Sequence, residues 1–435
     1  MKMTDIAEQI KKAKAATVGM AILSTETKNN ALACMADALD SSHVRVIEAN
    51  RKDLEEAEGK IPQALYKRMI VDDQKIDDMV AGIRSVMSLP DPVGEIMSAL
   101  DLDDDLTLYQ KRCPVGLLGV VFESRPDVVP QIMSLCLKSG NCVAFKGGSE
   151  ASRTIKTLFT ILKDAAASEG APGDGFVLME SREDVSSILE MDKYIDLMIP
   201  RGSNSFVRYI QDNTRIPVLG HSSGICHIFV DSECDMEKAF KVVLDSKIQY
   251  PAACNAVENL LVDAKVCKEF LPKMAEIFAE NKVEVRGDQR SREIVPGMKE
   301  ASEEDWDEEY NDLIISVRVV DGLQEAIDFI NSHGSHHTDA IITENMQKAS
   351  VFADMVDSAD VYVNASTRFA DGFRYGKGAE VGISTNKIHA RGPVGMEGLM
   401  IYKYVLIGNG QVVKDYVGAN AKPFKHTESN RRYPL

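Results

Sequence analysis

An alternation of apolar strands with amphipathic helices begins at Gly116 and constrains the fold more than any other feature of the sequence. Strands are predicted at 117–122, 142–145, 176–180, 197–199 and 217–219, and helices at 128–139, 149–167, 182–191 and 203–211. Strands joined by crossover helices run parallel, and the helices cover both faces of their sheet. The chain is therefore expected to be an α/β protein built on a parallel sheet.

Two loops at predicted strand ends carry candidate nucleotide-binding groups, because dinucleotides bind at the carboxyl ends of such strands. In FKGGSEAS, Lys146 can reach a ribose or a phosphate, and Gly147 and Gly148 let a ligand approach the backbone. Ser149 and Glu150 begin the next helix, whose amino end favours anions. A plain connection between a strand and a helix would have the same residues.

The second loop, IPRGSNSFV, repeats this arrangement with Arg201, Gly202 and Ser203. Two loops of this kind in one parallel sheet favour a nucleotide ligand. Neither a GxGxxG fingerprint nor a P-loop pattern occurs, so the usual dinucleotide loop does not carry the cofactor here.

A second α/β series follows in the chain. Its strands are predicted at 257–262, 314–320, 340–343 and 362–364, and its helices at 235–248, 267–281, 323–331 and 345–356. The acidic stretch 301–312 is expected to be a solvated connector that contains Trp306. A chain of 435 residues exceeds one ordinary core, so two or three domains are expected.

The remaining segments flank these two series. Apolar spacings of three and four predict helices from 6 to 87, and the alternation at 101–116 predicts an extended ribbon. An isolated ribbon is poorly stable, so it is expected to pair with another segment, such as one from a second subunit. A terminal hairpin is predicted between 404–407 and 411–413, followed by a frayed tail from Lys422.

One cysteine, Cys254, lies in the small-residue stretch QYPAACNA, directly before the apolar strand at 257–262. Pro251 stiffens the approach, and the alanines leave room around the sulfur. A thiol in such a loop suits attack on a carbonyl when a base is near or its pKa is lowered. The plainer interpretation of the local sequence is a small buried hydrophobe.

Charge and cysteine usage exclude several classes of function. The net charge of −17 argues against a nucleic-acid face and an anionic-membrane anchor. Eight cysteines without a CxxC pattern or a close Cys/His set argue against a zinc site and a disulfide framework, so no metal and a reducing, cytoplasmic location are expected. His336 and His337 are adjacent and should point apart, and His221 is interpreted as a surface-turn residue.

A glycine-rich basic block, 363–399, lacks regular periodicity and is typical of a binding loop. Its Arg368, Arg374 and Arg391 can bind carboxylate or phosphate in bidentate fashion. A surface loop at a subunit contact is the competing interpretation.

Five motifs in order, VFESRPDVV, FKGGSEAS, PRGSNSFVR, YPAACNA and NASTRFADGFRYGKGAEVGISTNKIHARGPVG, resemble the γ-glutamyl phosphate reductases of the aldehyde dehydrogenase superfamily. The resemblance covers nearly the whole chain. The sequence of residues 216–231 is most similar to the reductase half of the eukaryotic bifunctional pyrroline-5-carboxylate synthases. The kinase half of those enzymes is not in this sequence.

The resemblance implies an aldehyde dehydrogenase-like fold with three parts. Residues 1–100 and 116–231 would form a cofactor-binding domain, 232–400 a catalytic domain, 101–115 and 401–421 an oligomerisation ribbon, and 422–435 a tail. A homo-oligomer, dimer or tetramer, is implied, and glutamate 5-kinase is a possible partner.

The implied reaction is the NADPH-dependent reduction of L-glutamate 5-phosphate to L-glutamate 5-semialdehyde and phosphate, in proline biosynthesis. Cys254 would be the nucleophile that forms a thioester. The implied cofactor residues are Lys146, Gly147, Gly148, Ser149, Glu150, Arg201, Gly202, Ser203 and Glu309. The implied oxyanion and substrate residues are Ser124, Arg125, Asn255, Asn364, Ser366, Thr367 and Arg368.

Three alternatives to this reaction stay open on the sequence. A coenzyme A-acylating aldehyde dehydrogenase would need the same thiol. It would also lack the water-activating glutamate, where this chain has Gly220 and His221. A cysteine hydrolase would need a histidine near Cys254, which no sequence feature places. A non-catalytic partner of glutamate 5-kinase would have no need of an intact thiol or cofactor loops.

Overall fold

The computed structural model describes residues 3–123, 125–221, 223–377 and 379–434. Its backbone contacts separate two compact units. Residues 1–202, 210–218 and 395–435 make the first unit, and 203–209 and 219–394 make the second. Each unit contains a parallel sheet with helices, which confirms the α/β prediction.

The first unit is built on a four-stranded parallel sheet in the order β5-β4-β3-β6. Its strands are β3 (Leu117–Phe122), β4 (Cys142–Lys146), β5 (Phe176–Leu178) and β6 (Leu197–Arg201). The helices that connect them are α6 (Val128–Ser139), α7 (Ser152–Ser168) and α8 (Arg182–Leu189). Helix α9 (Asn204–Asp212) follows β6, and its residues are divided between the two units. The strand predicted at 217–219 is reduced to one bridge, between Met198 and Val218.

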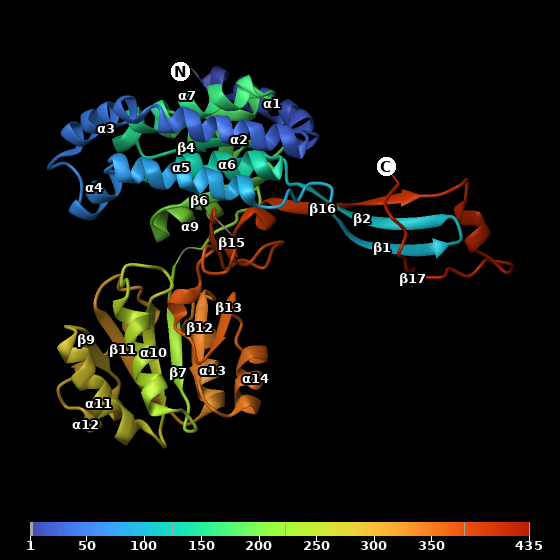
Figure 1. Ribbon diagram of the computed structural model, residues 1–435. Helices are drawn as coiled ribbons and strands as arrows, with labels where there is room; N and C mark the ends of the chain where they lie inside the picture. The colour runs from blue at the N-terminus through green and yellow to red at the C-terminus, as the bar shows by residue number, and fades with distance from the viewer. Residues whose placement is uncertain (1–2, 124, 222, 378, 435) are drawn as a thin grey trace. The chain divides into compact units, whose positions relative to one another are not determined.

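Local signals set the helix ends in this unit. Helix α6 is capped by Gly140, which has a left-handed φ of 74° that a residue with a Cβ rarely adopts. The N–H groups of Gly140 and Asn141 close the last turn by donating to the Leu137 and Cys136 carbonyls. The amino-terminal helices are α1 (Met3–Ala21), α2 (Thr25–Asp40), α3 (His43–Ala57), α4 (Gln63–Met69) and α5 (Asp73–Ser88). Figure 1 shows α2 and α5 beside α6, on which both pack.

A separate antiparallel sheet of the first unit has the order β16-β2-β1-β17. An extended ribbon does form where it was predicted at 101–116, but it begins earlier, as β1 (Ile96–Asp103) paired with β2 (Leu106–Pro114). Its partner within the chain is β16 (Met400–Ile407), which pairs with β2 along its whole length. Figure 1 shows these three strands side by side.

Two predictions for the carboxyl-terminal part are wrong. The segment 411–413 does not pair with β16, whose neighbour in the sheet is β2, because the chain turns into a 3₁₀ helix at Val413–Tyr416. The tail is not frayed, since β17 (Thr427–Glu428) pairs with β1. The Tyr433 ring also meets the edge of Tyr109, with ring centroids 5.2 Å apart.

The second unit is built on a seven-stranded parallel sheet in the order β10-β9-β11-β8-β7-β12-β13. The strands are β7 (Cys226–Val230), β8 (Val257–Asp263), β9 (Glu284–Gly287), β10 (Lys299–Glu300), β11 (Ile314–Val320), β12 (Thr338–Ile342) and β13 (Asp360–Val363). A small hairpin, β14 (Gly382–Ser384) with β15 (Gly392–Val394), follows. The cofactor-binding domain was expected to extend to residue 231, which would include β7. In the structure β7 pairs with β8 and β12, so it belongs to the sheet of the second unit.

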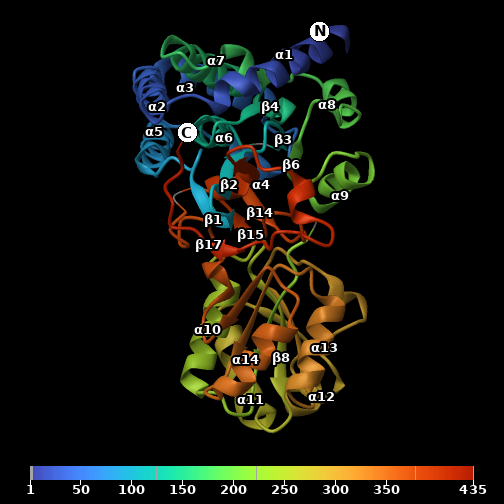
Figure 2. The ribbon, with the colours of Figure 1, turned by 90° about the vertical axis from the view of Figure 1, so that its right-hand side faces the viewer.

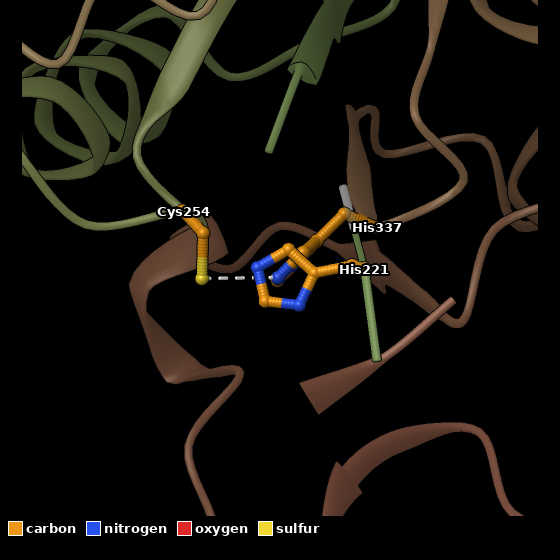
Figure 3. Close-up of side chains that lie close together, drawn as sticks. All are labelled: His221, Cys254 and His337. Atoms are coloured by element: carbon orange, nitrogen blue, oxygen red, sulfur yellow. Dashed lines mark hydrogen bonds between the residues drawn. The ribbon is translucent and has the colours of Figure 1, made fainter. Parts of the chain in front are cut away.

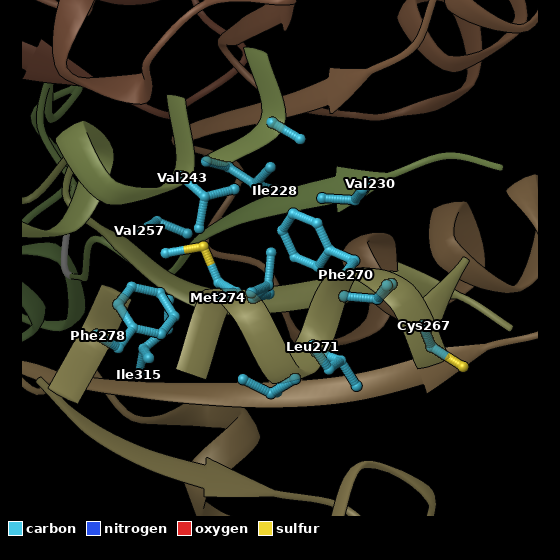
Figure 4. Close-up of a cluster of buried hydrophobic side chains, with 14 of the residues drawn as sticks. Ile228, Val230, Val243, Val257, Cys267, Phe270, Leu271, Met274, Phe278 and Ile315 are labelled. Atoms are coloured by element: carbon cyan, nitrogen blue, oxygen red, sulfur yellow. The ribbon is translucent and has the colours of Figure 1, made fainter. Parts of the chain in front are cut away.

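Side-chain alternation along these strands builds two cores. Ile228 and Val230 of β7 face a cluster with α10 (Met236–Ile248) and α11 (Cys267–Glu280), which Figure 4 shows. Phe229 between them faces the opposite cluster, with α13 (Leu323–His333) and α14 (Met346–Met355). Figure 2 shows α10 and α13 on opposite sides of this sheet.

Trp306 belongs to the second of these clusters, so the segment 301–312 is not a fully solvated connector as predicted. The indole is 3% exposed, and Asp305 beside it pairs with Arg286. Because acidic residues surround Trp306 in the sequence, its burial could not be predicted from the local composition. Every helix among the residues described is too short or too polar to span a bilayer.

Candidate active site

Cys254 lies in the second unit, in the loop that joins α10 to β8. Two backbone hydrogen bonds form tight turns there, from Ala253 N to Tyr250 O and from Ala256 N to Ala253 O. The Asn255 side chain anchors the loop by donating from Nδ2 to the Ala370 carbonyl, 2.8 Å away. The thiol is half-buried, so it combines a fixed position with access.

Gly224 lets another backbone segment approach Cys254 closely. A Cβ on Gly224 would lie 2.1 Å from the Cys254 carbonyl oxygen and 2.6 Å from its Cα. These atoms belong to backbone, which cannot move aside cheaply. Only glycine therefore fits beside the cysteine at this point.

Two histidines lie beside the Cys254 sulfur, as Figure 3 shows. His337 Nε2 is 3.2 Å from Cys254 Sγ, and its Nδ1 is 2.8 Å from Thr338 Oγ1. The His221 ring meets the His337 ring edge to face, with centroids 5.0 Å apart. His221 Nδ1 contacts the Ile383 carbonyl oxygen at 2.9 Å.

This geometry corrects two expectations. A histidine does lie within hydrogen-bonding distance of Cys254, although no sequence feature placed one there. His221 is not simply a surface-turn residue, because its ring packs on His337. His336, next to His337, points elsewhere as predicted, since its Nδ1 contacts the Asp357 carbonyl.

The sheet order explains why these residues meet. His221, Cys254 and His337 precede β7, β8 and β12 respectively, and these strands are neighbours in the order β8-β7-β12. Parallel strands bring their amino ends to the same edge of a sheet. The signal available in the sequence was therefore three reactive side chains, each a few residues before an apolar run.

Four other cysteines are poor nucleophiles near neutral pH, because burial raises their pKa and only the thiolate is reactive. Burial raises the pKa of the Cys136 and Cys226 thiols well above the ordinary value, and raises that of Cys142 to about 12. Burial also raises the pKa of Cys234 to about 11. Cys254 differs from this group in its histidine partner.

The segment 364–368, proposed for the substrate, is held against α10 by Ser246. Ser246 Oγ lies 3.0 Å from Ser366 Oγ and accepts from Thr367 N at 3.2 Å. Asn364 does not extend into open space: its amide pairs with both backbone groups of Thr343, at 2.9 and 2.8 Å. These side chains position the segment.

Arg368 is the cation of this segment that lies near the thiol. Its Nε donates to Gln249 Oε1 at 2.9 Å, in the same loop as Cys254. Burial and then the neighbouring Arg374 lower the pKa of Arg368, while Cys254 opposes that shift. A guanidinium in this position can bind an anionic group of a molecule that reaches the sulfur.

Two other candidate cations, Arg391 and Arg125, form ion pairs within their own units. Arg391 is engaged by Asp357, with Nη1 3.2 Å from Oδ1, and by the Thr385 carbonyl, so it ties its own loop together. Arg125 belongs to the first unit and pairs with Asp127 at 3.2 Å. Ser124 lies outside the described residues.

The first predicted nucleotide loop borders a pocket of about 270 Å³ in the first unit. Gly147, Gly148 and Ser149 line it at the end of β4, opposite Glu180 after β5. A Cβ on Gly147 would lie 2.3 Å from Ile155 Cδ1, and one on Gly148 would lie 2.0 Å from Glu150 Oε1. Side chains at these glycines would therefore crowd the pocket wall.

Lys146 and Arg201 stand at the same edge of this sheet. Lys146 is opposite Val121 in β3, and Arg201 is opposite the next residue, Phe122. Lys146 Nζ donates to the Gly147 carbonyl at 2.8 Å, and Arg201 Nη1 donates to Gln131 Oε1 at 3.3 Å. Two cations at one carboxyl edge, with a glycine-lined pocket, fit the ribose and phosphates of a dinucleotide.

The second loop divides between the units. Gly202 ends a segment of the first unit, and Ser203 begins a segment of the second. Within the second unit, Asn204 Nδ2 donates to Glu309 Oε2 at 2.8 Å, so the loop contacts this residue, which the resemblance implies for the cofactor.

Comparisons with known proteins agree with this fold and these motifs. Residues 1–312 match the family model described as the aldehyde dehydrogenase family. A protein of Methanosarcina mazei named γ-glutamyl phosphate reductase is 57% identical over 440 residues, covering 99% of this chain and 98% of that protein. A protein of the same name from Ruminiclostridium cellulolyticum is 52% identical, covering 98% and 99%.

Solved structures give the same result. The crystal structure of γ-glutamyl phosphate reductase from Thermotoga maritima superposes with a TM-score of 0.92 at 40% identity, covering 94% of this chain and 99% of that one. Glyceraldehyde-3-phosphate dehydrogenase GapN from Methanocaldococcus jannaschii, complexed with NADP, shares the fold with a TM-score of 0.67 at 16% identity, covering 94% and 95%.

Proposed function

The chain belongs to the aldehyde dehydrogenase family, among its γ-glutamyl phosphate reductases, and we propose that it reduces L-glutamate 5-phosphate to L-glutamate 5-semialdehyde and phosphate in proline biosynthesis. It is thus an oxidoreductase that acts on an acyl phosphate. The observation that supports the chemistry is the Cys254 thiol, half-buried in an anchored loop and 3.2 Å from His337 Nε2.

Acylation is the first step of the proposed mechanism. His337 Nε2 takes the proton of the Cys254 thiol, and the thiolate attacks the acyl carbon of the substrate. The bond from carbon to the phosphate oxygen breaks, phosphate leaves with a proton from solvent, and a thioester remains on Cys254. Arg368 holds an anionic group of the substrate during this attack.

Reduction completes the turnover. A reduced nicotinamide cofactor, when bound, would supply the hydride for reduction of the Cys254 thioester. The Cys254 backbone N–H is the proposed donor to the oxyanion that develops on the acyl oxygen. The oxyanion then collapses to the aldehyde, the carbon–sulfur bond breaks, and His337 returns its proton to the thiolate. One hydride and one solvent proton are consumed in total.

Water activation would waste the thioester by hydrolysis. Hydrolytic aldehyde dehydrogenases resemble this chain but carry a general-base glutamate where it has Gly220 and His221. The imidazole at this position contacts the His337 ring and the Ile383 carbonyl. Because this position has no carboxylate to activate water, it agrees with a reductase, in which the thioester must escape hydrolysis.

Aldehyde dehydrogenases use a nicotinamide cofactor, and for this chain we propose NADPH. Lys146, Gly147, Gly148, Ser149 and Glu150 would hold the adenosine ribose. Arg201, Gly202 and Ser203 would hold the pyrophosphate, and Glu309 the nicotinamide ribose. Lys146 with Ser149 provides donors for a 2′-phosphate. A higher kcat/KM with NADPH than with NADH is expected, and the reverse order would contradict the assignment.

The assembly that we propose is a homo-oligomer, a dimer or tetramer joined through the β1–β2–β16 sheet. A glutamate 5-kinase is proposed as a second partner, since an acyl phosphate is short-lived in water and gains from direct transfer. Co-elution of the two enzymes in the presence of substrates would support this association.

The reaction is best tested in reverse, because L-glutamate 5-phosphate is unstable. Purified protein is mixed with pyrroline-5-carboxylate, which equilibrates with glutamate semialdehyde, together with NADP and phosphate. We expect cofactor reduction, followed by absorbance, that requires phosphate and is abolished in Cys254→Ser. Cofactor affinity, measured separately, should be nearly unchanged in that variant.

Each of the other outcomes of this experiment would support one of the alternative functions. A signal independent of phosphate indicates a hydrolytic dehydrogenase, and a signal that requires coenzyme A indicates an acylating one. No signal with any of these indicates a non-catalytic partner of the kinase. Fast residual turnover in Cys254→Ser contradicts the assignment of the nucleophile.

A further inference from the structure

Cys254 and its two histidines together form a set of ligands for a soft divalent cation. Cys254 Sγ and one ring nitrogen each of His221 and His337 all lie within 4.8 Å of one another. Thiolate and imidazole are the ligands that Zn²⁺ prefers in proteins. The sequence has no close Cys/His pattern, so this set exists only in the folded chain.

The hydrogen bonds of the two imidazoles orient them for metal binding. A carbonyl oxygen only accepts, so His221 Nδ1 donates to Ile383 O and a neutral His221 carries its lone pair on Nε2. His337 Nδ1 contacts Thr338 Oγ1, which leaves Nε2 facing the sulfur. Contacts of this kind at the second ring nitrogen are typical of zinc-binding histidines.

The spacing suits a tetrahedral ion. Zinc lies about 2.0–2.1 Å from imidazole nitrogens and about 2.3 Å from a thiolate, so ligand atoms stand about 3.5 Å apart. His337 Nε2 and Cys254 Sγ are 3.2 Å apart, close to this value. Because all three ligand atoms lie within 4.8 Å, small side-chain rotations bring the third to the same ion. A water molecule would take the fourth position.

We propose that His221, Cys254 and His337 bind one Zn²⁺ per chain and that occupancy of this site reversibly inhibits the enzyme. Binding releases the thiol proton and places the sulfur lone pair on the metal, where it cannot attack an acyl carbon. The inhibition rests on the proposed function, whereas the binding itself does not.

A second group of candidate ligands provides an internal control. Asp40, His43 and Asp77 also lie within the same distance of one another, but both carboxylates are exposed. His43 Nδ1 contacts Asp73 at 2.7 Å, so His43→Ala dismantles that group without touching the cysteine. Metal bound only at the surface would be lost in His43→Ala.

The first experiment measures binding without activity. Reduced, metal-free full-length protein is titrated with Co²⁺ and followed by absorbance, and Zn²⁺ is then added as a competitor. We expect a thiolate-to-cobalt charge-transfer band and tetrahedral d–d bands at one equivalent, both displaced by Zn²⁺. The bands should be unchanged in His43→Ala and absent in Cys254→Ser.

His221→Phe is the decisive variant, because it keeps a ring against His337 and removes both nitrogens. His221→Asn is a second variant that keeps a donor towards Ile383. In both, at least ten-fold weaker Co²⁺ and Zn²⁺ binding is expected. An unchanged cobalt spectrum and affinity in these variants would overturn the site.

The second experiment measures turnover. Zn²⁺ should inhibit the wild type and the chelator EDTA should restore activity, while His221→Phe, with each rate taken relative to its own metal-free rate, needs at least ten-fold more Zn²⁺ for half-inhibition. Equal sensitivity of His221→Phe and the wild type would refute the inhibitory role. If the wild type shows no reductase activity, the proposed function fails, and the cobalt titration still decides the metal site.

Discussion

At the residue scale, the chemistry depends on the contact between Cys254 and His337. A thiol becomes a strong nucleophile when a base removes its proton, and His337 Nε2 is within hydrogen-bonding distance of the sulfur. Thr338 holds the other ring nitrogen, so the imidazole is already oriented. Gly224 contributes by leaving room for the Cys254 backbone.

Replacing His337 by glutamine should lower kcat/KM by about 100-fold or more, because a positioned general base contributes about that factor. The modification of Cys254 by iodoacetamide should slow at neutral pH. The difference from the wild type should narrow in alkaline solution, where hydroxide removes the thiol proton. Rates of alkylation measured against pH check this expectation.

His336→Gln is the matched control for this variant. His336 neighbours His337 but contacts the Asp357 carbonyl, so its replacement should leave the alkylation profile as in the wild type. Equal effects of the two substitutions, or a parallel slowing of alkylation at every pH, would mean that His337 only supports the local structure.

At the scale of elements, a buried ion pair joins α10 to β8 on either side of the Cys254 loop. Lys247 Nζ lies 2.6 Å from Glu258 Oε2, and both side chains are essentially inaccessible. Burial raises the pKa of Glu258 to about 8, against the opposing effect of Lys247, and burial lowers the pKa of Lys247. The two ends of the loop are thus held at a fixed separation.

These shifts imply a pH dependence with a definite sign. A carboxyl whose pKa rises on folding from 4.5 to about 8 stabilises the fold fully below the lower value and loses that contribution as the pH rises through the higher one. A lysine whose pKa falls on folding increases the free energy of unfolding as the pH rises, so Lys247 opposes the loss of stability caused by Glu258. Without Lys247, the loss caused by Glu258 is no longer opposed.

Lys247→Met should therefore lower the free energy of unfolding by about 1–3 kcal/mol near pH 6, where it leaves a buried polar partner unsatisfied. The loss should grow from pH 6 towards pH 8 by up to about 1.4 kcal/mol per pH unit, because the unfolded chain then ionises Glu258 while the fold keeps it protonated. Urea unfolding of the wild type and the variant at several pH values measures this difference in the free energy of unfolding. The double variant Lys247→Met with Glu258→Leu should lose the pH dependence.

Lys238→Met is the control, because the Lys238–Glu344 pair is half-exposed. The Lys238→Met substitution should change the free energy of unfolding little, and this change should not grow with pH. A pH-independent loss in Lys247→Met would show that Glu258 stays ionised without its partner, contrary to the shift caused by burial.

At the scale of the whole molecule, the β1–β2–β16 sheet has an apolar surface and an open edge. Strand β16 has no further neighbour among the described residues, so one row of its backbone groups is unpaired. Tyr404 and Leu406 on this strand are more than half exposed, and Tyr402 is 49% exposed. Exposed edges and apolar patches of this kind favour pairing with another chain.

Replacing Tyr404 and Leu406 together by aspartate should convert the expected homo-oligomer into a monomer, because charges on the exposed face oppose its burial. Size-exclusion chromatography with light scattering measures the mass. Ile22→Asp, at an exposed apolar residue after α1, is the control and should leave the mass unchanged. An oligomer that survives the double substitution would place the subunit contact elsewhere.

The sequence alone determined what depends on local periodicity. The bounds of α6, with Gly140 after it, and the strand Leu117–Phe122 agree with prediction residue by residue. The Cys254 loop was recognisable from its small residues, and the motifs identified the family. Each of these signals comes from neighbours within a few residues, where side-chain pattern and backbone preference act directly.

Only the tertiary structure decided which distant residues meet. His337 lies 83 positions from Cys254 and reaches it because β8, β7 and β12 are adjacent in the sheet, an order that no local pattern encodes. The tail became a strand because β1 offered an edge, and Trp306 became core because α13 lay above it. Pairing and burial of this kind follow from the packing of the entire unit, so the sequence predicts the nucleophile and the fold supplies its histidines.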